Sequence, residues 1–338
     1  MFLNIRFWNN REESARFFGI SRRRTPILPR APLKEIFIGG VMMTSVALTH
    51  HTEIGPAMEE ALNFLPADRL LRNKIVAIHP NDTTATEEDT SAVTQADTLE
   101  AAIRYVKRFQ PRELIVSGGS GASETDEVFR ITGMDRVIEK EQVRYVDHNK
   151  PPFATVLLDY GPMKEVVVHE GILRYETIIS LSQLKVHSQS VIVGAIKNIT
   201  MSWPAADYYG HPRMANKYGR SGMVEDKNAF IVGMLKRFRP HLGIVTGHPA
   251  MIATGPTGGI AVETGLVAAG LDPVSVDTVC ASLLGFTTMG VEYLRQAVKL
   301  GLGEGNLQRI EIKGLPLDEA KRIFNEKAYG VRRELKSA

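Results

Sequence analysis

Short apolar runs alternate with amphipathic segments through the middle of the chain. Ser45–Thr49, Lys74–His79 and Leu114–Ser117 have the length and composition of strands. Between them, Glu53–Leu65 and Thr98–Phe109 carry apolar residues every three or four positions, which predicts amphipathic helices. Strands that alternate with helices favour right-handed parallel crossovers. We therefore expect an α/β fold with a largely parallel sheet and helices on both faces.

The next part of the chain has a different pattern. Val143–Asp147, Ala154–Leu158 and Glu165–His169 are short strand candidates, and turns are expected between them at Pro151-Pro152 and Gly161-Pro162. Short strands without helical periodicity between them indicate a β-rich piece inserted into the α/β fold. We assign this inserted subdomain to residues 143–175.

The second half returns to strands and helices. Thr177–Leu181 predicts a strand, and Ser188 or Ser190 is expected to cap a helix that runs to about Met201. Trp203–Arg220 is polar, aromatic and irregular, as in a mobile flap. The remaining elements expected are helices over Asn228–Phe238, Pro273–Leu284 (capped by Asp272), Val291–Lys299 and Leu317–Asn325, and strands over Leu242–Thr246 and Ile310–Ile312.

The first 42 residues differ in composition from the rest. They contain seven Arg and one Lys against three Glu, a net charge of +5; since the whole chain carries +3, the remainder carries −2. Residues 43–330 are expected to form the α/β domain, and residues 1–42 an extension outside its fold. Ser21-Arg22-Arg23-Arg24 also matches a twin-arginine export signal. Two interpretations stay open: a cytoplasmic protein with an unstructured or untranslated extension, and an exported protein.

The totals exclude several classes of protein. A nearly neutral body lacks the basic face expected of a nucleic-acid-binding domain. The chain has one cysteine, Cys280, so it cannot by itself form a disulfide or hold an iron–sulfur cluster. No apolar run reaches the ~18 residues that span a bilayer, and no transmembrane segment is expected.

The strongest chemical signal is Leu184–Asn198, in which cationic and amide side chains interrupt apolar sequence. Lys185 and His187 follow one apolar run, and Lys197 and Asn198 end another. Burying an unpaired ammonium costs several kcal/mol. We therefore expect a cleft here that binds a small anion or a metal.

Four polar segments follow predicted strands: His79–Asp82, Gly118–Gly121, Lys185–His187 and Gly247–Gly259. In open parallel sheets, ligands bind beyond the carboxyl ends of the strands. If the four strands share a sheet, these segments therefore meet at one edge. The residues expected to contact a bound anion are Asn81, Gly119, Ser120, Gly121, Lys197, Asn198, Gly255, Thr257 and Asp277.

Two of these segments, and Asp277, have a second interpretation. The glycine-rich segments Gly118–Gly121 and Gly255–Gly259 could direct backbone N–H groups at an anion, but they are equally typical of tight turns. Neither matches a nucleotide-binding motif. Asp277 lies inside an otherwise apolar helix, where it is expected to pair with Lys185 or Lys197 or to face solvent.

Lys185 and His187 are the expected catalytic pair. Lys185 can bind an anion or act as a base with a lowered pKa, and His187 can transfer a proton. A divalent metal is a separate expectation, although no short metal-binding motif supports it. The histidines expected to hold that metal are His79, His187, His211 and His248. Those expected on the surface or in turns are His50, His51, His148 and His169.

The order of several motifs resembles that of domain-of-unknown-function family 362 (DUF362) over most of Ser45–Gly314. In this family a basic residue usually precedes Pro-Asn, and it is His79 here. The matching segments are Pro80-Asn81, Gly118–Gly121 with Thr125-x-Glu127-x-x-Phe129, Leu184-Lys185-x-His187, Ala195-x-Lys197-Asn198, Gly255-Pro256, Asp272-Pro273-Val274-x-Val276-Asp277, Leu284-Gly285-Phe286 and Gly301–Gly305.

The resemblance has implications for partners and chemistry. Members of the family often carry a ferredoxin-like module with cysteine-ligated clusters, which a single cysteine excludes here. The resemblance therefore implies an iron–sulfur protein as a partner. The domain is also distantly similar to the catalytic domain of nickel-dependent lactate racemase, in which a lysine holds a nickel-pincer nucleotide and histidines act as acid and base. Lys185 with His187 is the local match.

Three functions follow from these patterns. The first is a small-molecule enzyme with racemase- or isomerase-like proton transfer on a carboxylate- or phosphate-bearing substrate. Lys185 and Lys197 would hold the anion, His187 would move the proton, and Asn81 and Asn198 would orient groups. The alternatives are a binding or redox-accessory module that serves an iron–sulfur partner, and a metal-binding or metal-delivery protein. A homo-oligomer is compatible with each.

Overall fold

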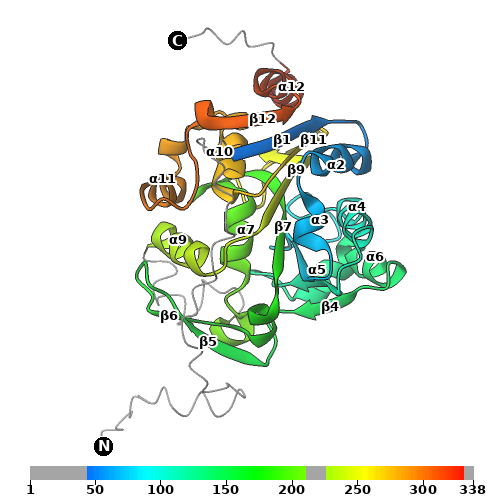
Figure 1. Cartoon of the computed structure of the whole chain (residues 1–338), viewed down its shortest axis with the longest axis vertical. Helices are drawn as coiled ribbons and strands as arrows, with labels where there is room; N and C mark the ends of the chain where they lie inside the picture. Colours follow the sequence, from blue (N-terminus) through cyan, green and yellow to red (C-terminus); the bar gives the residue numbers. More distant parts are fainter. Residues whose placement is uncertain (1–43, 211–225, 331–338) are drawn as a thin grey trace, which may run out of the picture.

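The chain is built around one mixed sheet. The computed structural model describes residues 44–210 and 226–330, and within them ten strands form this sheet. Figure 1 shows the sheet running through the molecule between two groups of helices. The main order of its strands is β12 (Ile310–Gly314), β1 (Thr44–His50), β11 (Leu266–Gly270), β9 (Leu242–Ile252), β7 (Thr177–His187), β2 (Ile75–Pro80), β3 (Glu113–Gly118) and β4 (Arg144–Asp147).

The centre of the sheet is parallel. Neighbouring pairs from β9 through β7, β2 and β3 to β4 all run in the same direction, as does β1 beside β12. The strand β11 lies antiparallel between β1 and β9, and two short strands, β8 (Val191–Val193) and β10 (Ile260–Val262), pair antiparallel with β7 and β9. The expected α/β fold with a largely parallel sheet is confirmed.

Helices cover both faces of the sheet, as the alternation of side chains along the strands requires. In β2, Val76 and Ile78 join one core, whereas Ala77 joins a core on the other face. The first face is covered by α2 (Ile54–Asn63), α3 (Ala67–Leu71), α4 (Ala96–Lys107), α5 (Thr125–Thr132) and α6 (Met134–Lys140). The other is covered by α7 (Ala195–Ser202), α9 (Lys227–Arg237), α10 (Pro273–Leu283), α11 (Glu292–Lys299) and α12 (Leu317–Tyr329).

The inserted β-rich piece is smaller than expected. It is a two-stranded antiparallel sheet of β5 (Phe153–Leu157) and β6 (Glu165–His169), followed by a 3-10 turn, η1 (Glu170–Arg174). Its apolar side chains share a core with Trp203 and with one face of the main sheet. The first expected strand of the insertion, Val143–Asp147, is instead the edge strand β4, because it pairs in parallel with β3.

Two expectations near the site were wrong. The strand β7 does not end at Leu181 but continues through a β-bulge to His187, and β8 pairs back onto it. The residues after Ser190 therefore form a strand, since β-branched Val191–Val193 finds a partner there, and α7 begins only at Ala195.

The expected flap also begins with ordered structure. Trp203 is fully buried, and a short helix, α8 (Ala206–Tyr209), follows it. Residues 211–220 of that segment lie outside the described residues.

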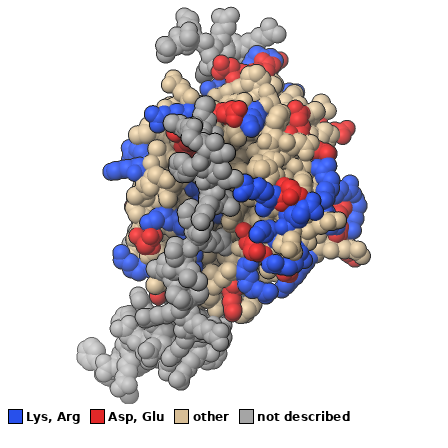
Figure 2. Space-filling view, viewed as in Figure 1, with Lys and Arg blue, Asp and Glu red and all other residues tan. Residues whose placement is uncertain are grey.

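The surface of the molecule is mixed in charge on the face shown in Figure 2, where Lys and Arg side chains lie among Asp and Glu. Several are paired across α4 and α6; Glu141, for example, accepts ion pairs from both Arg104 and Lys107. Within the described ranges, no helix combines the length and apolar character that crossing a membrane requires.

Candidate functional site

The four polar segments expected to converge do leave the same edge of the sheet. They follow or extend β2, β3, β7 and β9, which are adjacent and parallel, so their carboxyl ends point the same way. β7 and β9 run beyond their neighbours, and Lys185 of β7 is paired with Met251 of β9 in this extension. The site is therefore built on strands as well as on the segments that follow them.

Lys185 lies fully buried in this extension. Its Nζ donates to Asn81 Oδ1 at 2.7 Å and to the carbonyl oxygen of Ala92 at 2.5 Å, both in the segment that follows β2. Burial lowers the pKa of Lys185 to about 7, and the charge of Asp82 opposes this shift. Near neutral pH, the amine is therefore divided between its protonated and neutral forms.

Two asparagines hold the acceptor that faces Lys185. Asn81 Nδ2 donates to Asn198 Oδ1 at 3.0 Å, so its own oxygen points at the lysine. Asn198 Nδ2 in turn donates to the carbonyl oxygen of His79 and to Ser180 Oγ. Both side chains are buried, and these contacts bind the ends of β2 and β7 to α7. The structure thus brings the predicted Asn81, Lys185 and Asn198 into one hydrogen-bonded chain.

Two more lysines and a histidine lie beside Lys185. Lys197 is 9% exposed, and its side-chain amine makes no hydrogen bond or ion pair with another residue in the described ranges. Burial, followed by the charges of Lys185 and Lys227, holds the pKa of Lys197 well below its usual value. Half-buried Lys227, at the start of α9, contacts Gln189 Oε1, and burial lowers its pKa. We call Lys185, Lys197, Lys227 and His187 the basic cluster.

His187 has one ring nitrogen in use. Its Nδ1 accepts from the backbone N–H groups of Gln189 and Ser190 at 3.0 and 3.2 Å, so in the neutral ring the proton lies on Nε2. Burial lowers the pKa of His187 to about 3, with further contributions from the three lysines of the basic cluster. Near neutral pH this histidine is therefore an uncharged hydrogen-bond donor.

The glycine turn after β3 contacts the one carboxylate beside the cluster. Asp82 is buried, and its Oδ2 accepts from the N–H of Gly119 at 2.7 Å. The N–H of Ser120 donates to Thr125 Oγ1, and its hydroxyl donates to the carbonyl oxygen of Thr83. Because these groups already donate within the protein, the contacts of Gly119 and Ser120 favour a tight strand-to-helix turn over an anion cradle; the expected role of Gly121 stays a prediction.

The second glycine-rich segment packs against the end of β7. β9 continues through its first half to Ile252, which shortens the expected loop. The carbonyl oxygen of Gly255 accepts from the N–H of Ser188, and a Cβ at Gly255 would lie 2.0 Å from the carbonyl oxygen of Val186. Gly255 is therefore required for close packing beside His187, whereas Thr257 is exposed.

Asp277 was expected to pair with a lysine or to face solvent, and it does neither. It is fully buried in α10 and accepts from the N–H groups of Ala195 and Ile196 at 2.6 and 3.2 Å and from Tyr293 Oη at 3.0 Å. It thus caps the first turn of α7, the helix that carries Lys197. Burial raises the pKa of Asp277 to about 7, and its three donors oppose that rise.

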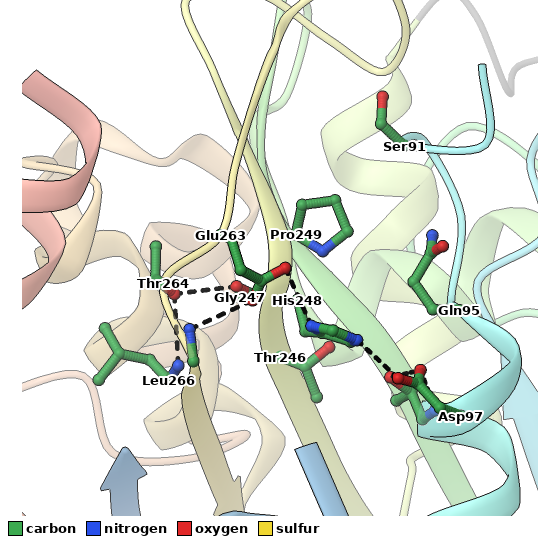
Figure 3. Close-up of polar contacts among 12 residues, drawn as sticks. Ser91, Gln95, Asp97, Thr246, Gly247, His248, Pro249, Glu263, Thr264 and Leu266 are labelled. Carbon is green, nitrogen blue, oxygen red and sulfur yellow. Dashed lines mark hydrogen bonds and ion pairs between the residues drawn. The ribbon is translucent and has the colours of Figure 1, made fainter. Parts of the chain in front are cut away.

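Of the four histidines expected to hold a metal, the three that the structure describes make separate contacts. His79 contacts Ser117 Oγ at 3.0 Å, and His248 lies between Asp97 and Glu263, 2.9 Å from each, as Figure 3 shows. These two carboxylates raise the pKa of His248 to about 9. His211 lies outside the described residues. Among those that are described, no group of three or more His, Cys, Asp or Glu side chains could hold a metal ion.

One histidine expected at the surface is instead in the core. His148 is fully buried, contacts Tyr175 Oη at 2.8 Å, and stacks on His79 with ring centroids 6.2 Å apart. Burial holds its pKa well below the usual value for histidine. Its place after the edge strand β4 gives no sign of this burial in the sequence.

Sequence reasoning also missed Lys227 and Asp82 as parts of the site. Lys227 follows the N-cap Asp226 of α9 and looks like any polar residue at a helix start. Asp82 follows Asn81 in a polar segment, and its burial depends on Gly119, which belongs to another loop. Neither position has a periodicity or motif that could have singled it out.

The chain was compared with models of known protein families. A family model described as domain of unknown function (DUF362) matches residues 76–282, more than half of the chain. The chain belongs to this family. The match to DUF362 runs from β2 to α10, so it includes the lysines of the basic cluster and Asp277. A comparison with curated proteins finds no match. The distant similarity to lactate racemase stays a prediction.

We predict that Asp277→Asn lowers the free energy of unfolding by about 1–3 kcal/mol, because an amide nitrogen cannot accept from the N–H groups of α7 and leaves a buried donor without a partner. Urea denaturation measures this change. Asp318→Asn, at an exposed position in α12, is the matched control and should have little effect. Equal stabilities for the two variants would contradict the capping role.

A second prediction concerns the contribution of Lys185 to the pH dependence of folding stability. Its pKa is about 7 in the folded protein against an ordinary value of 10.5, so between these pH values the unfolded state binds more protons. Folding stability should therefore rise with pH across this range, by up to about 1.4 kcal/mol per pH unit for this group. Urea denaturation at several pH values should show the difference between wild type and Lys185→Met growing accordingly. With exposed Lys164→Met as the control, parallel curves for Lys185→Met and wild type would contradict the shifted pKa.

Proposed function

We propose that this protein is an enzyme that binds a small carboxylate- or phosphate-bearing substrate at the basic cluster and transfers a proton through Lys185. The observation that carries the proposal is the burial of both Lys185 and Lys197. Within the described residues, Asp82 is the carboxylate whose charge acts on Lys185, whereas the charges that act on Lys197 are those of Lys185 and Lys227. Buried charges in proteins are normally paired. A bound anion would supply the missing partner.

Lys197 and Lys227 are suited to hold the anion. They come from different elements, α7 and α9, and each acts on the pKa of His187. Lys197 has no competing acceptor within residues 44–210 and 226–330. An ammonium is a compact charge that can approach a carboxylate or a phosphate oxygen from several directions. These two side chains would therefore fix the charged end of a substrate.

His187 receives a different role from the one expected from sequence. Because Nδ1 accepts two backbone N–H groups, the ring can offer only Nε2–H to a ligand. A pKa of about 3 makes protonation rare at neutral pH. His187 would then donate a hydrogen bond to the substrate and leave proton transfer to another group.

Lys185 is better suited to move the proton. A general base works best when its pKa lies near the working pH, and the pKa of Lys185 is about 7. In its neutral form the amine uses two N–H groups on Asn81 Oδ1 and the carbonyl oxygen of Ala92, which leaves the lone pair for a substrate. The proton would leave a carbon next to the carboxylate and bind to Nζ. The electron pair would stay on the substrate, stabilised by Lys197 and Lys227, until the proton returns.

The other two functions expected from sequence have less support. A metal-delivery role would need histidines that converge, and His79, His187 and His248 make separate contacts. A redox-accessory role beside an iron–sulfur partner is not tested by any contact of the described residues. Both stay predictions.

Hydrogen–deuterium exchange tests the proposal. Wild-type protein is incubated in D2O with a panel of 2-hydroxycarboxylates, dicarboxylates and phosphate esters, and proton NMR follows the signals of the carbon-bound hydrogens. We expect at least one compound to lose a signal with wild type and with Lys164→Met, and at least a hundredfold more slowly with Lys185→Met. Exchange that is unchanged in Lys185→Met, or absent across the whole panel, would contradict proton transfer by Lys185.

A further inference from the structure

We infer that the ligand of the basic cluster carries at least two negative charges, as a phosphate monoester or a dicarboxylate does, and that it binds together with protons. The inference rests on the proposed anion site and names the class of its ligand. It follows from the charges that surround the site and from their burial.

The charged groups at the site come from four parts of the chain. Lys185 and His187 belong to β7, Lys197 to α7 and Lys227 to α9, and Asp82 lies in the segment after β2. The charge of Lys185 acts on Lys197, both lysines act on His187, and Asp82 is the carboxylate that acts on Lys185. Within the described residues, the site thus joins three amines, one neutral imidazole and one carboxylate.

One carboxylate can balance one of the three ammonium groups. Asp82 also accepts from the N–H of Gly119, so part of its charge already interacts with the backbone. Among residues 44–210 and 226–330, two amines are left without an opposite charge, and one of them, Lys197, is nine-tenths buried. A ligand with a single charge would leave one ammonium unbalanced, whereas a dianion balances both.

Ligand binding should be coupled to the uptake of protons, because the protonation of the buried amines depends on an opposite charge nearby. Burial lowers the pKa of each of the three lysines, and that of Lys185 is about 7, so a fraction of the Lys185 amine is neutral near pH 7 without an anion. An anion in contact with these amines stabilises their protonated forms. Binding must then take up protons, and by linkage the affinity must fall as the pH rises.

Matched pairs of probes separate charge from shape. Methyl phosphate and dimethyl phosphate share the phosphate group but carry different charges, and succinate and monomethyl succinate share a carbon chain. Isothermal titration calorimetry at pH 7.5, in two buffers of different ionisation enthalpy, gives both affinity and proton uptake. We expect the dianion of at least one pair to bind at least tenfold more tightly than its partner, with uptake of about one proton or more and weaker binding at pH 9.

Three other outcomes would overturn the inference. They differ in whether the proposed anion site itself is also excluded. Equal affinity within each pair, lost in Lys197→Met but not in Lys164→Met, would leave the anion site standing and exclude the requirement for a dianion. Tight binding of a dianion without proton uptake would exclude the coupling to protons. No binding of any probe to wild type would remove the proposed anion site as well. A thermal denaturation curve for Lys197→Met confirms that the variant folds.

Discussion

The burial of the Lys185 amine is the constraint on which the rest of the site depends. An amine without water must find acceptors, and Asn81 Oδ1 and the carbonyl oxygen of Ala92 supply them. The orientation of Asn81 requires Asn198, and Asn198 donates to the backbone carbonyl oxygen of His79 near the end of β2. The lysine therefore sets the positions of the segment after β2 and of α7. Because burial removes water from the amine, its pKa falls into the range where proton transfer is useful.

The second requirement is that α7 be fixed from its other end. Asp277 accepts from the first N–H groups of the helix, and Gly194 permits this contact, since a Cβ there would lie 2.3 Å from the carboxylate. Asn198 fixes the same helix from the sheet side. Lys197 lies between these two attachments and makes none of its own within the described chain. A rigid helix thus presents a lysine whose amine remains available to a ligand.

Hydrophobic periodicity predicted the helices and strands whose conformation is determined by their local sequence. The helix expected over Asn228–Phe238 is observed as α9 over Lys227–Arg237, and the parallel order of the central strands followed from their alternation with helices. The sequence could not show that Val191–Val193 would pair with β7 instead of continuing a helix, because that choice depends on a distant partner. The lysines were predictable as unusual residues in apolar surroundings. The role of Asp277 in capping α7 was not, since Ala195, whose N–H it accepts from, lies 82 residues away along the chain.

The most direct test is an NMR titration of the Lys185 side chain in protein labelled at lysine Cε. The resonance absent from Lys185→Met identifies the group. The account predicts that this resonance titrates near pH 7 and that its midpoint moves upward when methyl phosphate or succinate binds at the basic cluster. A midpoint near 10.5 would contradict a lowered pKa, and with it the assignment of Lys185 as the residue that transfers the proton.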